Sequence, residues 1–347
     1  MRIRNLFIAF ATIAVGVAFS LGARATDDRV APPISPIVTP LVTPSVTQAP
    51  IATGHLYDRI AVVGASASDG FGVSVREDAP AIDSNPPVKK RTPTRLNLAD
   101  VLRYAARPST IDGASAMTTI IHHYASGFFF ANPGPVGRSE IDRSLAINPT
   151  LVLGLDFLFW YVYGTVTADG KPMVTAPDRL ANLDAGLAQL DRLVSAGIPL
   201  VIADIPDMHD AIGKMLSESQ VPEVDALAPI NARIAQWVKA RPTVTIMPLS
   251  HILTALKSGG VIELAGRTWD PAELGELLQN DQLHPTFAGT VIIAAGLIDL
   301  ARTNDASLTP PFEFKPKAIR ERALAKSAAK KDSKPESPAT AGSTTVR

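Results

Sequence analysis

The sequence predicts an α/β fold in which helices cover both faces of a central parallel sheet, a three-layer α/β/α sandwich. Three observations lead to it. Short apolar runs without strict polar alternation recur along residues 56–308, as expected for strands buried on both faces. Stretches with helical periodicity separate these runs. The chain has 347 residues, 46% of them hydrophobic, which is enough to bury one large core.

The apolar runs and the stretches between them alternate along the chain. Strands are expected over 59–64, 118–124, 150–155, 199–204 and 243–248. Helices are expected over 178–196, 230–239 and 287–301. In the first of these helices, leucines spaced by three and four form one apolar stripe, and Gly197 and Pro199 then end the helix before the next strand. Such alternation favours a parallel sheet.

The first 25 residues have the pattern of a signal peptide. Arg2 and Arg4 precede an apolar run over 6–21, and Ala23 and Ala25 provide small residues at a cleavage site. The run of 16 residues is short for a bilayer span. We therefore expect cleavage after Ala25, export to the periplasm or the medium, and no membrane span in the mature form. An uncleaved anchor is the alternative.

The segments on either side of the expected domain, which spans residues 55–308, lack the apolar patterns of a folded core. Residues 26–54 are proline-rich and are expected to form a disordered linker. Residues 309–347 are expected to form a disordered basic tail, with at most a short helix around 319–331. From Lys315 onward there are nine Lys or Arg and three Asp or Glu, a charge of +6, and residues 1–25 carry +3 from Arg2, Arg4 and Arg24. Because the whole chain is neutral, residues 26–314 carry a net charge of −9. An acidic body argues against nucleic-acid binding.

A serine at the end of a predicted strand and a histidine near the end of the domain could form a catalytic pair. Parallel sheets of this kind bind ligands at the carboxyl ends of their strands. Ser66 follows the first expected strand, within residues 64–69 (GASASD), and Asp281 and His284 lie three apart before the last helix. A serine needs a base to take its proton, and a carboxylate fixes the tautomer of that base. Cysteine is absent, which excludes a thiol nucleophile, disulfides and thiolate metal sites. We therefore predict Ser66 as nucleophile, His284 as base and Asp281 as its partner.

These motifs resemble those of the SGNH (GDSL) hydrolase family over residues 57–303. Residues 64–69 match its first block, Gly-Asp-Ser-x-Ser, and residues 281–285 (DQLHP) match its fifth. Gly127 fits the glycine of the second block, and Asp156 occupies the asparagine position of the third. The resemblance implies a flavodoxin-like fold, hydrolysis of an ester without a cofactor, and an oxyanion hole formed by Ser66, Gly127 and the residue at 156. It also implies an insertion over 73–117, either a lid or rim over the site or a surface excursion.

The sequence departs from the family pattern at three positions. Ala65 replaces the aspartate beside the nucleophile, and Phe157 replaces the second residue of the Asn-Asp pair. Asp156 replaces the asparagine whose amide helps to hold the oxyanion, and an ionised carboxylate there would repel it. Either Asp156 is protonated and donates through its O–H, or the hole consists of the Ser66 and Gly127 N–H groups alone.

The predicted function is that of an exported serine ester hydrolase that works through an acyl-enzyme. Its substrate is a small-molecule, lipid or glycan ester, so both an esterase or lipase and a carbohydrate-ester deacetylase remain open. The aromatic run 157–163 either lines an acyl pocket or packs in the core. The alternatives are a weakly active or inactive glycan- or lipid-binding protein of the cell envelope on the same fold, and an acyltransferase. The sequence leaves the oligomeric state open.

Overall fold

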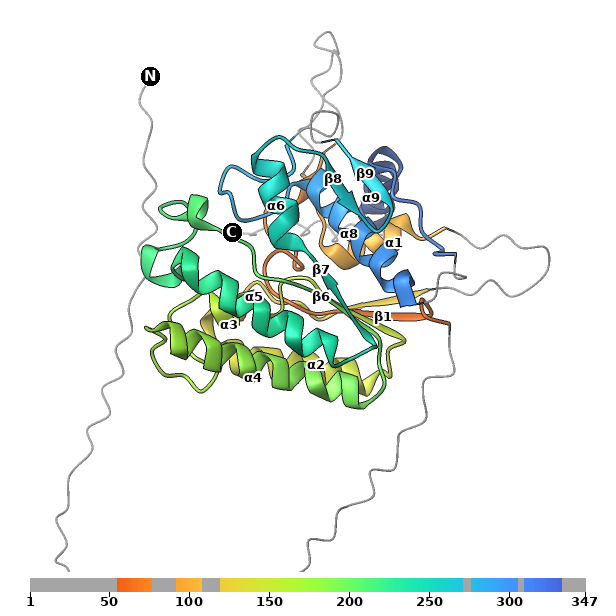
Figure 1. Ribbon diagram of the computed structural model, residues 1–347. Coiled ribbons are helices and arrows are strands. Elements are labelled where there is room, and N and C mark those ends of the chain that lie inside the picture. Colours follow the sequence, from red (N-terminus) through yellow and green to blue (C-terminus); the bar gives the residue numbers. More distant parts are fainter. Residues whose placement is uncertain (1–54, 77–91, 108–118, 271–275, 305–308, 333–347) are drawn as a thin grey trace, which may run out of the picture. The chain divides into compact units, whose positions relative to one another are not determined.

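Five parallel strands form the centre of the protein, in the order β4-β1-β5-β6-β7 (Figure 1). The computed structural model describes residues 55–76, 92–107, 119–270, 276–304 and 309–332. When these five strands are numbered from 1 to 5 along the chain, their spatial order in the sheet is 2-1-3-4-5, which is the flavodoxin-like order. All five lie where the sequence predicts strands. The expected signal peptide, the linker, part of the insertion and the end of the tail lie outside the described residues.

The strands of the central sheet are β1 (Arg59–Val62), β4 (Ile120–His123), β5 (Leu151–Gly154), β6 (Leu200–Ala203) and β7 (Val244–Met247). Two small antiparallel pairs are β2 (Ser74–Val75) with β3 (Thr94–Arg95), and β8 (Ile262–Leu264) with β9 (Arg267–Trp269). The α-helices are α1 (Leu98–Ala105), α2 (Pro133–Ala146), α3 (Phe159–Val162), α4 (Ala176–Ser195), α5 (Val224–Lys239), α6 (Leu249–Lys257), α8 (Phe287–Ala301) and α9 (Pro316–Asp332). The 3₁₀ turns are η1 (Phe129–Ala131), η2 (His209–Ala211), η3 (Glu218–Gln220) and η4 (Arg302–Asn304).

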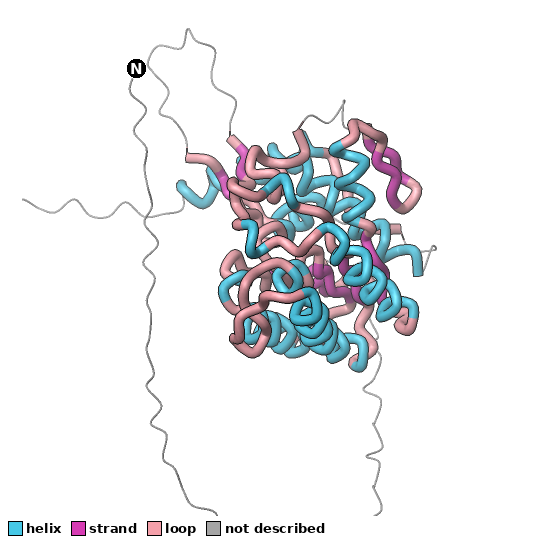
Figure 2. Tube along the Cα trace, turned by 60° about the vertical axis from the view of Figure 1, so that its left-hand side comes forward, coloured by secondary structure: helices cyan, strands magenta, loops and turns pink. Residues whose placement is uncertain are grey.

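Alternate residues of each central strand point to opposite faces of the sheet, so each face has its own core. Ala61 and Val152 face a core that includes residues of α2, α3, α4 and α5. Ile60 and Leu151 face a second core that includes residues of α1, α8 and α9. Figures 1 and 2 show these helix layers on either side of the strands. Burial on both faces explains why the strands lack polar alternation.

The helix predicted over 178–196 is confirmed as α4 and begins at a capping box. The Asp178 N–H donates to the Thr175 hydroxyl at 3.3 Å, and the Thr175 N–H donates to the Asp178 carboxylate at 2.8 Å. A proline in the first turn is compatible with the helix because its missing N–H would have no partner there. Four leucines of the predicted stripe are buried in the core, and Leu180 is partly buried against it; the four are Leu183, Leu187, Leu190 and Leu193.

The disordered tail predicted from residue 309 is ordered over 309–332. The short helix expected around 319–331 is present as the longer α9, which packs against α1. Ile319 and Ala323 are fully buried, and the Arg322 guanidinium donates to the carbonyl of Tyr104 at 2.5 Å. Phe312 is buried against Tyr57 before the helix begins. The two buried apolar positions, spaced by four, are difficult to recognise in the sequence because basic residues surround them.

The structure adds elements inside the expected insertion over 73–117, and it contains a helix, α2, that was not predicted from the sequence. The described parts of the insertion contain the β2–β3 pair and α1. α2 begins with Pro133, Gly134 and Pro135, residues that read as a turn in the sequence. Prolines in the first helical turn are nevertheless compatible with a helix.

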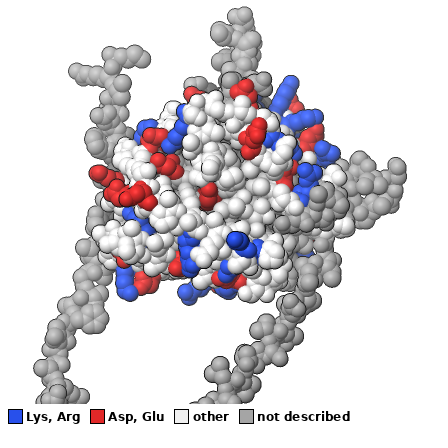
Figure 3. Space-filling model, viewed as in Figure 1, with Lys and Arg blue, Asp and Glu red and all other residues white. Residues whose placement is uncertain are grey.

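Acidic and basic side chains are interspersed over the face shown in Figure 3. Among the described residues, no helix is both long and apolar enough to cross a bilayer.

Candidate active site

Ser66 lies just beyond the carboxyl end of β1, where the chain enters a tight helical turn. The Asp69 N–H donates to the carbonyl of Ala65 at 2.8 Å, which closes that turn. Gly64 precedes it with a φ of 136°, and a Cβ at this position would lie 2.3 Å from an oxygen of Asp156. Glycine is therefore required at the entry to the turn. The turn presents the Ser66 hydroxyl beyond the edge of the sheet, at the strand ends where such folds bind ligands.

His284 and Asp281 meet Ser66 from the other end of the chain, in the turn before α8. The His284 Nε2 is 2.8 Å from the Ser66 Oγ, and its Nδ1 is 2.8 Å from an oxygen of Asp281. Because Asp281 accepts the proton on Nδ1, Nε2 is free to accept the hydroxyl proton of Ser66. The structure thus brings together the three residues that the sequence predicted.

The carboxylate of Asp281 is held in place by backbone donors as well as by the imidazole. One of its oxygens accepts from the N–H groups of Leu283 and His284, each at 3.0 Å. Burial by itself raises the pKa of Asp281, but these N–H groups and the His284 ring outweigh it and keep the pKa below its usual value. Asp281 therefore remains ionised opposite His284, which is itself almost completely buried.

Phe71 covers the imidazole of His284, a contact that was not predicted from the sequence. The two ring centroids are 4.5 Å apart at an interplanar angle of 32°. The side-chain amide of Gln279 donates to the carbonyl of Phe71 at 2.7 Å and so ties this loop to the turn that carries His284. A half-exposed phenylalanine after a glycine reads as a surface residue in a sequence.

Asp156 has a different role from the one predicted for it. Its carboxylate accepts from the N–H groups of Ala65 at 2.9 Å and of Ala67 at 2.8 Å. The Ser68 hydroxyl donates to it as well. Both oxygens of Asp156 thus act as acceptors for the turn around Ser66. The assignment of Asp156 to the oxyanion hole is corrected, because its oxygens fix the nucleophile turn and donate no proton in any of these contacts.

The N–H of Gly127, which was also expected in the oxyanion hole, already has an acceptor. It donates to a carboxylate oxygen of Asp69 at 3.0 Å, and the other oxygen lies 3.4 Å from His123 Nε2. Burial raises the pKa of Asp69, although His123 and the Gly127 N–H oppose the shift. Within the described part of the chain, the Ser66 N–H has no acceptor. Of the two backbone donors expected in the oxyanion hole, Ser66 is thus the one whose N–H is open among the described residues.

Glu140 reaches the same turn from α2 and is completely buried. Its carboxyl accepts from the Gly64 N–H at 2.7 Å. Burial raises the pKa of Glu140 to about 9, and the nearby Asp156 adds to the shift while the Gly64 N–H opposes it. A protonated carboxyl and the Asp156 carboxylate therefore hold the two sides of the entry to Ser66. Glu140 was not predicted as part of the site because α2, the helix that carries it, was not predicted from the sequence.

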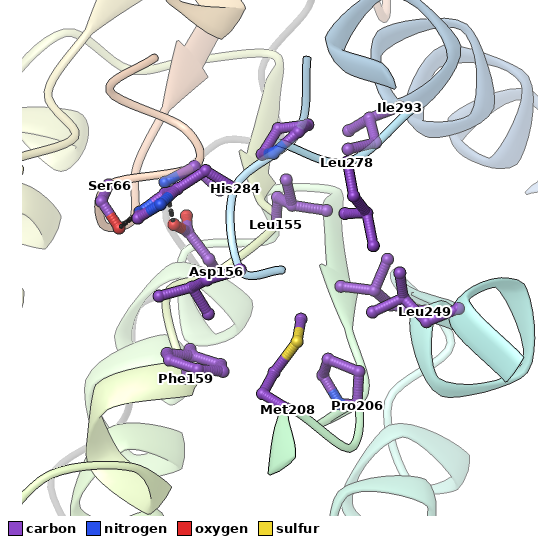
Figure 4. Close-up of a pocket in the computed structure, with 14 residues that line it drawn as sticks. Ser66, Leu155, Asp156, Phe159, Pro206, Met208, Leu249, Leu278, His284 and Ile293 are labelled. Carbon is purple, nitrogen blue, oxygen red and sulfur yellow. Dashed lines mark hydrogen bonds between the residues drawn. The ribbon is translucent and has the colours of Figure 1, made fainter. Parts of the chain in front are cut away.

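A cavity of about 60 Å³ opens beside Ser66 and His284 (Figure 4). Apart from Ser66, Asp156 and His284, its lining is nonpolar: Ala67, Leu155, Phe159, Pro206, Met208, Leu249, Leu253, Leu278, Leu283, Pro285 and Ile293. From the aromatic run 157–163, Phe159 alone lies in this wall. Phe157, Tyr161 and Tyr163 are fully buried in the core.

Comparison with known proteins does not identify the activity. No protein-family model and no curated protein matches the chain. Among solved structures, it is similar to the psychrotrophic esterase EstA from Pseudoalteromonas sp., inhibited by monoethylphosphonate, with 15% identity, a TM-score of 0.37, and coverage of 71% of this chain and 97% of that one. It is also similar to a gut microbial diltiazem-metabolizing enzyme, with 14% identity, a TM-score of 0.42, and coverage of 70% of this chain and 46% of that one. The chain thus spans less than half of the second protein.

Proposed function

We propose that the protein is a serine ester hydrolase. The observation that carries the proposal is the continuous hydrogen-bonded series from Ser66 through His284 to Asp281, with both separations at 2.8 Å. A serine, an imidazole in a fixed tautomer and an ionised carboxylate at these distances form the apparatus for nucleophilic acyl transfer.

The proposed reaction has two steps. His284 Nε2 takes the proton of Ser66 as the Oγ attacks the ester carbonyl, and the same proton passes to the departing alcohol as the acyl-enzyme forms. His284 then deprotonates a water molecule, whose oxygen attacks the acyl carbon and releases the acid, and the proton returns to Ser66. Asp281 stabilises the imidazolium in both steps.

The oxyanion formed in each step has an open donor in the Ser66 N–H. The Gly127 N–H becomes a second donor only if it leaves Asp69. Removing a single donor from an oxyanion hole typically lowers kcat by about 10²–10³-fold. The contact between Asp69 and Gly127 therefore sets the rate of the proposed enzyme without changing its chemistry.

Ser66→Ala tests the proposal. We expect kcat/KM for p-nitrophenyl esters to fall at least about 10³-fold, because no other side chain replaces the nucleophile. Ser195→Ala, at an exposed position near the end of α4, is the matched control and should retain full activity. A fluorophosphonate probe should label the wild type at Ser66. Unchanged hydrolysis by Ser66→Ala would refute the assignment.

The second candidate is a weakly active or inactive binding protein on the same fold. The occupied Gly127 N–H and the acceptor role of Asp156 favour it, because both remove donors that an oxyanion needs. Absence of fluorophosphonate labelling in folded wild-type protein would support this candidate. An acyltransferase would share the labelling but would pass the acyl group to an alcohol in preference to water.

We also propose that the enzyme acts outside the cytoplasm, on the strength of the arginines, the apolar run and the small residues in the first 25 positions. N-terminal sequencing of the mature protein should then begin at Thr26. A mature chain that starts at Met1 would contradict cleavage.

A further inference from the structure

We propose that the cavity beside Ser66 binds the acyl chain of the substrate, and that it selects aliphatic acyl groups longer than acetyl. This inference depends on the proposed ester hydrolysis and goes further, because it chooses between the two substrate classes that the sequence left open. Ser66 and His284 form part of the cavity wall. An acyl group attached to Ser66 therefore enters the cavity directly.

The chemistry of the lining favours a hydrocarbon chain over a sugar. Ser66, His284 and Asp156 are its only side chains with polar groups, within the part of the chain that the structure describes. The first two would be engaged in the reaction, and Asp156 already accepts from Ala65, Ala67 and Ser68. A sugar hydroxyl placed deeper in the cavity would lose its hydrogen bonds to water without gaining new ones from the lining, which costs free energy. A methylene chain would gain from leaving water.

The size of the cavity limits the length of the chain. One water-sized group needs about 10–15 Å³ measured in this way, so a cavity of about 60 Å³ holds roughly four to six such groups. A methylene is of similar size to a water molecule. The cavity thus fits an acyl chain with at least about four carbons beyond the carbonyl.

Leu249, in the first turn of α6, marks the far end of the cavity. Figure 4 shows Leu249 and Pro206 on the opposite side of the cavity from Ser66. Leu253 also lines the cavity and lies one helical turn after Leu249, so both leucines project from the same face of α6. Leu256, on the same helix, does not line the cavity and provides a control.

The test measures kcat/KM of the full-length chain for p-nitrophenyl esters from acetate to dodecanoate. In the wild type, kcat/KM should rise roughly fourfold for each added methylene up to pentanoate or hexanoate, and then level off or fall. Leu249→Phe should move the optimum towards acetate, and Leu249→Ala should move it to longer chains. Leu256→Ala should keep the wild-type optimum. A wild-type profile that falls from acetate onward, with no shift in either Leu249 variant, would overturn the proposal even if Ser66→Ala is inactive.

A second measurement keeps the inference testable if no ester is hydrolysed. Hexanoate should raise the melting temperature of the Ser66→Ala protein more than acetate does at the same concentration, since a ligand that binds the native state stabilises it. Leu249→Phe introduced into that protein should abolish the difference. This result would support the acyl-chain site even if the wild type hydrolyses no ester. Equal effects of the two acids would overturn the acyl-chain site whatever the esterase assay shows.

Discussion

Asp69 controls how many donors an oxyanion on Ser66 meets, because its carboxylate holds the Gly127 N–H. Asp69→Ala removes both the acceptor and the negative charge, so we expect kcat for a p-nitrophenyl ester to rise about 10-fold or more. Asp69→Asn keeps an acceptor oxygen and removes only the charge, and it should give a smaller rise. Steady-state kinetics of the two variants measures this. A fall in kcat in both would mean that Asp69 is needed to position the Gly127 peptide.

At the residue scale, the sequence predicted the identity of the reacting groups better than the direction of their hydrogen bonds. Asp281 and His284 lie three apart in one turn, and Ser66 follows a strand end, so local spacing and sheet topology were sufficient to place all three. Asp156 and Gly127 also lie close to the nucleophile turn. Which of their atoms donate or accept depends on Ala65, Ala67 and Asp69, and spacing alone does not reveal that.

At the scale of elements, α2 links the stability of the protein to pH through Glu140. The buried carboxyl has a pKa of about 9, whereas its ordinary value is 4.5. Between these two values the native state holds a proton that the unfolded state has lost. The stabilisation is therefore complete below about pH 4.5 and is lost as the pH rises through about 9. The groups that act on this carboxyl are Asp156, Asp69, Arg143 and the Gly64 N–H.

Glu140→Gln should remove this part of the pH dependence. We expect the free energy of unfolding of the wild type to decrease, relative to the variant, by on the order of a few kcal/mol between pH 5 and pH 9. Urea unfolding at several pH values measures it. Asp142→Asn is the matched control, because Asp142 lies on the same helix but pairs with Arg192 at the surface. If the Glu140→Gln and wild-type curves stay parallel, Glu140 is not protonated in the native state.

The elements that the sequence predicted well were those with strong patterns. The five central strands carry short, mostly apolar runs and α4 carries a leucine stripe, and the structure confirms each of these elements. α2 was missed because its first turn resembles a loop. α6 was missed as well, although it supplies Leu249 and Leu253 to the cavity. Its apolar positions were assigned to no element because it is a short helix directly after the proline that ends β7.

At the scale of the whole molecule, α9 extends the folded domain to residue 332. Ala323→Glu would place a charge at a fully buried position against α1, and we expect it to destabilise the protein by about 2–4 kcal/mol. Ala325→Glu, at an exposed position two residues further along the same helix, should change stability by less than about 0.5 kcal/mol. Thermal unfolding followed by circular dichroism measures both. Equal melting temperatures of the two variants would show that α9 contributes nothing to the fold.

The reacting hydroxyl and imidazole are separated by 218 positions in the chain. Ser66 follows the first strand of the central sheet, and His284 precedes α8, after every strand of that sheet. A chain released or cut before the turn at 281–284 thus carries a serine with no base. In the proposed enzyme, catalytic competence therefore requires that residues 281–284 have been synthesised and have met the turn that follows the first strand. The proposed hydrolysis would accordingly report that the first and last parts of the central sheet domain have come together, and under the proposed export the chain would be inactive while it crosses a membrane.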